Sequence, residues 1–597
     1  MPQKKRKYAE YPPLAAFRYR LGEHDPLLAL AFIGIISGLA SGLMIAAFLL
    51  GIEALTSWVT TSSASILANT PDFESISAER RALTVLIGCA GLGLLYQLIS
   101  PKHRYTGLNH TLVRVHKNNG RFSPLNLLVQ FFGGIIALGT GASGGREGPG
   151  IHLGAGVTSV LAQRYNLPHN SLRIAAACGA AGAIGASFNT PIAGVIFAME
   201  VIIMEYTLIG FIPVILSAVT ATLISHAFFG NQSVFEIADM QLNSLLEIPF
   251  LAFIGLACGC ASVLFIRVQQ FSQPLLKLPV SVRFGLVGII TAIVGLMLPQ
   301  IMGMGYDTVN QTLSSSTVWQ TLLIICLMKI IVTAFSSAMG MPIGIIGPAL
   351  FIGVLLGSAI GQIGAELVPQ YASSPAFYGL LAMCGVMGSL LNAPLAATIA
   401  VMELTRNTDA LLPGILVIVI ANLCSTLIFG QRSANQALLE SQGISLDTHP
   451  VAQALNRLGL SAIIDRNVRL LPEILSQEIL EESLAEEART VVIQHDSLDK
   501  NGRQKTFYYT LTRKQFQQLL SQDGTSMISD STSLVRALKN SNIEPQELLE
   551  VNVELTVEQA RQLLFNNECA GLWVNDPKGP LQGVLKRETL PRLIENW

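Results

Sequence analysis

NTPIAGVIFAME, residues 189–200, recurs in the second half of the chain as NAPLAATIAVME, residues 392–403. The two stretches align without a gap and match at Asn, Pro, Ala, Ile, Met and Glu. Upstream of each lies another matching pair, GPGIHLG (148–154) and GPALFIG (347–353). Duplicated halves with short segments interrupted by Gly and Pro are typical of membrane proteins that bind a solute near the middle of the bilayer.

The composition of the 597-residue chain also indicates a membrane protein. Hydrophobic residues make up 51% and charged residues 13%, about half the share of a soluble domain, and the mean hydropathy is +0.50. The net charge of -1 gives no indication of nucleic-acid binding. The 8 cysteines show no CxxC pairs, so we expect no metal site and no disulfide framework.

Apolar stretches recur through the first three quarters of the chain, and several approach the roughly 20 residues that a spanning helix needs. Others are short or broken by Gly and Pro, and such segments are tolerated at membrane depth only inside protein or beside a water-filled cavity. We therefore predict an α-helical multi-pass membrane protein with two repeats, about 27–230 and 247–442, joined to a soluble α/β domain. An odd number of crossings in each repeat would make the two topologies inverted, with broken helices at the centre.

Both ends of the chain are polar. The basic arm 1–26 lacks the layout of a signal peptide and is expected to lie in the cytoplasm, with the protein in the inner membrane. From 443 to 597 the pattern alternates between helix-like and strand-like stretches, including a helix-like segment at 478–490. NDPKGP (575–580) predicts a turn between two short strands. An even number of crossings would place this tail in the cytoplasm as well.

GREGPG (145–150) and IGIIGP (343–348) each place a glycine-rich turn before a helix start. Free N–H groups and the helix dipole make such starts favourable for anions, and a pair of them would bind an anion without any full positive charge. Weak binding of this kind suits a conducting pore. Glu147 is itself an anion on a flexible tether, so it could occupy the site of a permeating anion and act as a gate. The alternative is that Glu147 simply pairs with Arg146 or favours a helix N-terminus.

GREGP, the second helix start and VMELT (401–405) resemble the CLC family of chloride channels and chloride/proton exchangers over residues 27–442. The resemblance implies a prokaryotic homodimer with one pore per subunit, built from inverted repeats and binding chloride or similar small anions. It needs no cofactor and is not an enzyme. By this resemblance Glu147 matches the gating glutamate. The motif residues around it are Gly145, Arg146, Gly148 and Pro149, and Ile345 and Ile346 match the backbone amides of the second helix start.

Several positions depart from the family pattern. YTGLNH (105–110) replaces GSGIP, so Thr106 stands at the serine position and keeps a hydroxyl donor, whereas Asn109 replaces the proline. Asn435 falls where a pore-lining tyrosine is usual, and Gln130 stands where a lysine is common. The expected anion-binding residues are Thr106, Gly107, Arg146, Gly148, Ile345, Ile346 and Asn435.

Proton coupling is the function that these departures put in doubt. Exchangers of the family often carry a second glutamate after the position of Glu200, and here that residue is Val201, which cannot relay a proton. We therefore expect a passive channel. The alternative is a chloride/proton antiporter that uses another relay such as Glu205, which shares a helical face with Val201 if the helix continues. AMEVIIMEYT (198–207) approaches a helix end, however, and in that case Glu205 would point to water.

Other polar residues of the apolar region have structural interpretations. Glu200 and Glu403 stand at equivalent positions near helix ends and are expected to satisfy backbone donors. Lys329 is expected to be structural or to snorkel towards the interface, with a direct pore role as the alternative. His152 is expected to pack against a neighbouring helix.

The tail resembles the CBS modules found in many CLC proteins. Residues 553–590 show the order helix, strand, turn, strand and helix, and 468–520 resembles a degenerate first copy. Nucleotide-binding modules end in an Asp where this chain has Thr589, so we expect a tail without bound nucleotide. A soluble nucleotide-binding enzyme is the other alternative, but no Lys-Ser/Thr pair follows GGREGPG and apolar stretches surround it.

Overall fold

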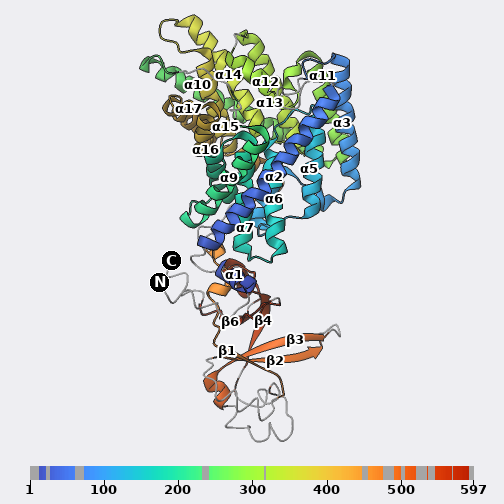
Figure 1. The fold of residues 1–597 in the computed structure, drawn as a ribbon, viewed down its shortest axis with the longest axis vertical. Coiled ribbons are helices and arrows are strands. Elements are labelled where there is room, and N and C mark those ends of the chain that lie inside the picture. Colours follow the sequence, from blue (N-terminus) through green and yellow to red (C-terminus); the bar gives the residue numbers. More distant parts are fainter. Residues whose placement is uncertain are drawn as a thin grey trace. The chain divides into compact units, whose positions relative to one another are not determined.

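The chain forms two compact units (Figure 1). The larger unit falls within 30–165 and 172–447, and the smaller one within 1–29, 166–171 and 448–597. The connection 166–171, which includes the first residues of a helix that begins at His169, is flanked in sequence by the larger unit, yet it packs as part of the smaller one. The computed structural model describes residues 13–21, 27–60, 73–231, 235, 241–314, 317–446, 455–474, 490–498, 504–518, 534, 543, 545–567, 569–577 and 579–589.

Helices make up the larger unit. Among the described residues, 9 helices are long and apolar enough to cross a membrane, which agrees with the sequence expectation. The α-helices of this unit are α2 (Leu27–Thr60), α3 (Ala78–Leu98), α4 (Gly107–Lys117), α5 (Pro124–Gly139), α6 (Glu147–Arg164), α7 (His169–Phe188), α8 (Pro191–Phe197), α9 (Leu208–Phe229), α10 (Ile248–Ser272), α11 (Val280–Met297), α12 (Tyr306–Ser314), α13 (Trp319–Ala338), α14 (Ile346–Leu367), α15 (Pro375–Leu391), α16 (Pro394–Thr405), α17 (Leu411–Leu423) and α18 (Ala434–Ser441). Shorter helical segments are η1 (Pro101–His103), η2 (Ala198–Ile203), η3 (Leu245–Glu247), η4 (Gln273–Lys277), η5 (Pro299–Ile301) and η6 (Cys424–Ile428).

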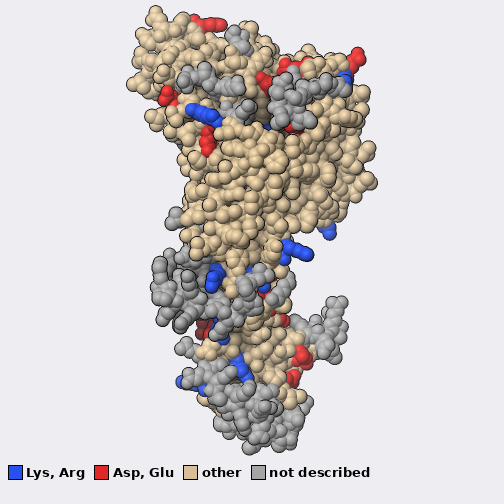
Figure 2. All heavy atoms as spheres, in the orientation of Figure 1, with Lys and Arg blue, Asp and Glu red and all other residues tan. Residues whose placement is uncertain are grey.

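The surface of this unit fits a lipid environment. Figure 2 shows its middle as almost without charged side chains, whereas acidic and basic residues gather towards its two ends. Large apolar side chains such as Phe32, Leu94 and Leu223 are exposed, at 58%, 63% and 62%. Exposed apolar area of this extent is rare on soluble proteins and typical of a membrane-facing surface.

Equivalent helices of the two halves pack against each other. α3 lies beside α11 (Figure 1), and α8 lies beside α16. The Glu403 carboxylate at the end of α16 accepts the N–H groups of Ile192 at 3.0 Å and Ala193 at 2.7 Å, at the start of α8. Glu200 in turn accepts the N–H of Ala396, at the start of α16, at 2.8 Å. The start of each helix therefore lies at the end of the other, so the two are antiparallel and the repeats are inverted.

These contacts confirm the expectation that Glu200 and Glu403 satisfy backbone donors. The first N–H groups of a helix have no partner within the helix and need an acceptor when they are buried. Each carboxylate supplies that acceptor to the opposite repeat, and a negative charge at a helix start is also favoured by the helix dipole.

The smaller unit contains a mixed sheet of six strands in the order β1 to β6. Neighbouring strands β1 and β2, and β4 and β5, run parallel, whereas the other neighbours are antiparallel. Its core is apolar and includes Val557, Leu564, Leu572 and Leu585. The elements are α1 (Pro13–Leu21), η7 (Leu460–Ala462), β1 (Val468–Leu471), β2 (Thr490–Leu498), β3 (Gln504–Thr512), β4 (Gln546–Asn552), α23 (Val557–Asn566), β5 (Gly571–Asn575) and β6 (Gln582–Lys586).

The expected turn at 575–580 is confirmed, because it joins β5 to β6. The α/β character expected of the tail is confirmed as well, with a helix, a strand, a turn and a strand in order from α23 to β6. Most of the helix-like segment 478–490 and the closing helix near 590 lie outside the described residues.

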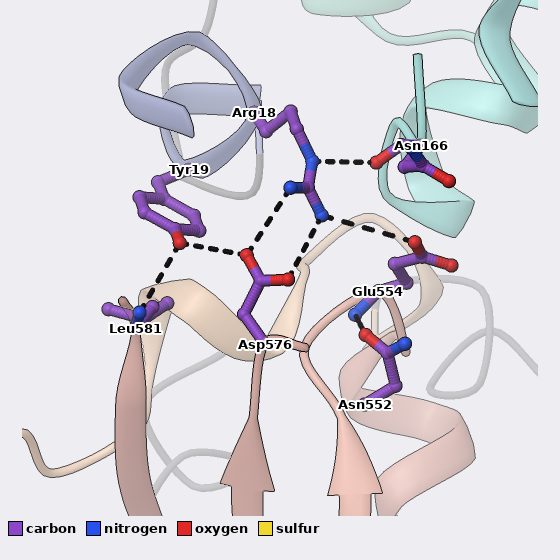
Figure 3. A network of polar contacts seen from close by, with 7 residues as sticks. All are labelled: Arg18, Tyr19, Asn166, Asn552, Glu554, Asp576 and Leu581. Atoms are coloured by element: carbon purple, nitrogen blue, oxygen red, sulfur yellow. Dashed lines mark hydrogen bonds and ion pairs between the residues drawn. The ribbon is translucent and has the colours of Figure 1, made fainter. Parts of the chain in front are cut away.

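A buried polar network ties three distant segments of the smaller unit together (Figure 3). The Asp576 carboxylate lies 3.3 Å from a guanidinium nitrogen of Arg18 and accepts the Tyr19 hydroxyl at 2.8 Å. Arg18 Nε donates to the carbonyl of Asn166 at 2.8 Å, and the N–H of Leu581 donates to the Tyr19 hydroxyl at 3.3 Å. The N-terminal helix, the 166–171 connection and the β5–β6 turn therefore meet around one carboxylate.

Tyr19→Phe is expected to loosen this network. Burial, together with the neighbouring Asp576 carboxylate, raises the pKa of the Tyr19 phenol, so the hydroxyl remains a donor at neutral pH. Losing one such hydrogen bond costs about 0.5–1.5 kcal/mol. Amide hydrogen exchange in β5 and β6 should become several-fold faster. The control is Tyr165→Phe, whose ring is 55% exposed; equal exchange in the two variants would contradict the prediction.

Candidate anion-binding site

The starts of α6 and α14 meet at a pair of glycines. Gly145 donates to the carbonyl of Gly344 at 2.8 Å, and Gly344 donates back to Gly145 at 2.7 Å, as in a single rung of antiparallel sheet. A Cβ on Gly148 would lie 2.7 Å from the Cα of Gly344, so only glycine allows this approach. The two positive helix ends expected from GREGPG and IGIIGP are thus brought together.

The Glu147 side chain is directed at the opposite helix start. It is 1% exposed, and its Oε2 accepts the N–H of Gly347 at 3.1 Å. Its Oε1 accepts the hydroxyl of Tyr306. Gly347 belongs to the first turn of α14, where the N–H groups have no acceptor within the helix. The carboxylate therefore lies where a small anion would find backbone donors.

Arg146 does not neutralise Glu147. Among the described ion pairs, none joins these two residues. Arg146 Nη2 instead donates to the carbonyl of Ser187 at 2.7 Å, and its guanidinium lies over the rings of Phe188 and Tyr306 at 5.7 and 5.5 Å. The simple ion pair considered as the alternative for Glu147 is therefore absent here, and Arg146 anchors the loop before α6 to the end of α7.

Ile345 and Ile346 open α14 beside this contact. Ile345 is the residue before the helix and Ile346 its first residue, and both are buried. Their N–H groups belong to the same unsatisfied helix start as that of Gly347. The position of Pro149 and Pro348 early in their helices agrees with the sequence expectation, because proline has no N–H to leave unsatisfied there.

Two buried polar side chains stand at matching positions of the two repeats, on α5 and α13. Gln130 Oε1 accepts the N–H of Gly107 at 2.6 Å, and its Nε2 donates to the carbonyl of Pro342 at 3.4 Å. Lys329 is fully buried and donates to the carbonyls of Ile301 at 2.9 Å and Gly303 at 3.0 Å. Lys329 does not snorkel, and its structural role is confirmed.

The remaining expected ligands lie on α4 and α18, which pack against each other. Thr106 is half-buried at the start of α4, and its hydroxyl does not cap that helix. The Gly107 N–H is bonded to Gln130. Asn435 lies in the first turn of α18, buried, with no protein partner for its amide nitrogen among the described residues. Thr106 and Asn435 thus supply side-chain donors in this region.

His152 packs against α4, as expected. Arg114 Nε donates to His110 Nε2 at 2.8 Å, and the other nitrogen of His110 lies 3.0 Å from His152 Nε2. Since arginine is always a donor, His110 must carry its proton on Nδ1 and donate it to His152. The pair is therefore a neutral, directional hydrogen-bond chain between α4 and α6.

Val201 and Glu205 do not share a helical face. Val201 lies in the π-helical segment η2, which ends at Ile203 because Met204 adopts a left-handed conformation with φ 58°. Glu205 is 8% exposed, and its Oε1 lies 3.8 Å from Arg173 Nη2. The helix end that AMEVIIMEYT indicates is confirmed, because the helix stops before it reaches Glu205. The Glu205 side chain is buried, however, and does not point to water.

A family model described as "Voltage gated chloride channel" matches residues 85–426, more than half of the chain. The chain belongs to this family. A ClcB-like chloride channel protein of Ralstonia nicotianae is 30% identical over 331 residues, which cover 54% of this chain and 77% of that protein. The H(+)/Cl(-) exchange transporter ClcA of Vibrio parahaemolyticus is 29% identical over 322 residues, or 52% of this chain and 69% of that protein.

The crystal structure of a eukaryotic CLC transporter has a similar fold, with a TM-score of 0.58 and 18% sequence identity. The match covers 94% of this chain and 98% of that one. Membership of the CLC family makes this chain a multi-pass membrane protein of an anion-transporting family that contains both channels and proton-coupled exchangers.

Tyr306 was missed by the sequence analysis. The signal that could have found it is GMGY (303–306), where two glycines precede an aromatic donor inside the apolar region.

Proposed function

We propose that this CLC protein is a passive chloride channel whose pore is gated by Glu147. The observation that carries the proposal is the Glu147 carboxylate bound by the Gly347 N–H at the start of α14. A carboxylate and a chloride ion compete for the same donors, so the ionised side chain closes the pore and its protonation or displacement opens it. Binding through backbone dipoles alone is weak enough to let the anion leave.

The permeating anion would meet further donors beyond this point. We assign that role to the backbone amides of Ile345 and Ile346, to the Thr106 hydroxyl and to the Asn435 amide. Gly148 permits the close approach of the two helices, and Arg146 holds the loop. The Gly107 N–H is a weaker candidate, because Gln130 already accepts it at 2.6 Å.

The residue at position 201 supports a channel over an exchanger. Val201 offers neither donor nor acceptor at the position where exchangers often carry a glutamate. Glu205 is the alternative relay, and a chloride/proton antiporter is the alternative function. The antiporter alternative is supported by the position of Glu205, a buried carboxylate that follows shortly after Val201 in the chain. Its ion pair with Arg173 argues against it, because the carboxylate is already held by a cation at 3.8 Å.

We also propose the assembly and location typical of the family. The protein would be a homodimer with one pore per subunit in the inner membrane of a prokaryote. The N-terminal arm 1–26 and the tail 443–597 would lie in the cytoplasm, around the transmembrane domain 27–442. The order of α23, β5 and β6 supports a CBS-like tail. We propose that this tail binds no nucleotide, because Thr589 stands where nucleotide-binding modules have an Asp.

The test is chloride flux from the purified protein in liposomes, with the internal pH recorded at the same time. We expect a chloride gradient to drive chloride flux, with no uphill movement of protons. The matched comparison is Glu205→Gln, which should leave this behaviour unchanged. A proton gradient built up by the chloride gradient alone, and lost in Glu205→Gln, would show that the protein is a chloride/proton antiporter and not a passive channel.

A further inference from the structure

The group that holds Glu147 most closely is a side chain, not a backbone amide. The Tyr306 hydroxyl donates to Glu147 Oε1, while the N–H of Gly347 donates to Oε2. A Cβ added to Gly347 would lie 2.9 Å from the Tyr306 hydroxyl and 3.1 Å from Glu147 Oε1. The hydroxyl, the N–H and the carboxylate therefore surround one small volume at the start of α14.

The Tyr306 ring is held in place from several sides. It is 6% exposed, and it lies against the rings of Phe188 and Phe235, with centroid distances of 6.3 and 5.8 Å. The loop before it is fixed by Lys329, which donates to two carbonyls there, and by the N–H of Gly144, which donates to Gly303 at 3.2 Å. A hydroxyl mounted so firmly remains in position when a mobile partner leaves.

We propose that the Tyr306 hydroxyl is a ligand of the anion site at the start of α14: it binds the Glu147 carboxylate in the closed pore and the permeating chloride in the open one. The site is then not built of backbone amides alone. This inference rests on the proposed gating role of Glu147.

Two consequences follow for transport. A donor to the ionised carboxylate favours the closed state, so its removal lets Glu147 take up a proton at higher pH. A donor to chloride strengthens binding, so its removal weakens the site once Glu147 is out of the way. The other charged groups near Glu147 are Arg146, which faces the Tyr306 ring at 5.5 Å, and the buried Lys329. Removing the Tyr306 hydroxyl alters neither of these groups. The change in the pH dependence of opening and the change in chloride binding can therefore both be assigned to the loss of the hydroxyl.

The experiment compares Tyr306→Phe with the wild type in liposomes, measuring chloride flux from pH 4 to 8. Phenylalanine keeps the ring packing and removes only the donor. We expect half-maximal flux about one pH unit higher than in the wild type, because a hydrogen bond to a charged group is worth about a tenfold change in equilibrium. In a Glu147→Ala background the pH effect of Tyr306→Phe should vanish, and chloride binding measured by calorimetry should weaken about threefold or more.

The matched control is Tyr378→Phe. That hydroxyl also donates to a buried carboxylate, Glu247, at a different place in the larger unit. The Tyr378→Phe substitution should leave the pH profile of chloride flux unchanged. A wild-type profile in Tyr306→Phe, or a shift that persists without Glu147, would overturn the role of the hydroxyl. If the Glu147→Ala protein keeps the wild-type pH profile, the proposed gating role of Glu147 is wrong. If Glu147→Ala loses its pH dependence while Tyr306→Phe behaves as the wild type, the gating role stands and only the role of the Tyr306 hydroxyl is wrong.

Discussion

Chloride flux through Glu147→Gln and Glu147→Ala should be nearly independent of pH and should stay high at neutral pH. In the wild type the ionised carboxylate occupies the donors at the start of α14, and flux rises only as acid protonates it. Glutamine cannot ionise, and alanine leaves the site empty. Glu147 is 1% exposed and bound by both Gly347 and Tyr306, so its ionised side chain should block the site effectively. The measurement is chloride efflux from liposomes at several pH values.

The control is Glu366→Gln, an exposed carboxylate near the far end of α14. It changes the net charge by the same amount without touching the site, so its pH profile should match the wild type. If both substitutions at Glu147 gave the wild-type profile, this residue would not be the gate.

Gly344→Ala should destabilise the protein and abolish chloride binding. A Cβ at this position would lie 2.5 Å from the N of Gly148 and 3.0 Å from the O of Gly145. Both atoms belong to the backbone, so no side-chain rotation can relieve the clash and the two helix starts must separate. Overpacking of this kind costs about 1–3 kcal/mol. Thermal unfolding in detergent and calorimetric titration with chloride measure the two effects.

Gly91→Ala and Gly285→Ala are the matched controls. Both glycines lie in membrane helices, α3 and α11, and a Cβ on either would meet no atom within 4 Å. Alanine is also the better helix former, so these variants should be as stable as the wild type or slightly more stable. A Gly344→Ala protein with the same melting temperature and chloride affinity as these controls would contradict the close contact of the helices.

The repeat and the two helix starts were readable because a glycine- and proline-rich pattern constrains the backbone itself. Glu147 stood out because a lone carboxylate in an apolar region has few functions. Tyr306 follows two glycines in GMGY (303–306), but this pattern does not reveal the partner of its hydroxyl, which only the structure places beside Glu147. Gln130 and Lys329 were noticed singly, although the register that aligns 148–154 with 347–353 already places them at the same position of the two repeats.

AMEVIIMEYT (198–207) indicates that a helix ends nearby, but the residue at which it stops, Ile203, depends on the left-handed conformation of Met204 and on the packing around it. The grouping of 166–171 with the smaller unit is of the same kind, because hydrogen bonds to Arg18 and to the tail decide it. Local patterns predict helices, whereas the points at which helices stop or exchange partners are set by contacts far away in the chain.

The crossed contacts of Glu200 and Glu403 mean that neither repeat is a complete folding unit. The residue that stabilises the start of α8 is made some two hundred positions later, at the end of α16. During synthesis, the first half must therefore wait for the second before this helix start has an acceptor. The same geometry suits an ancestor made of two identical, oppositely oriented chains, in which a single glutamate per copy would have served its partner.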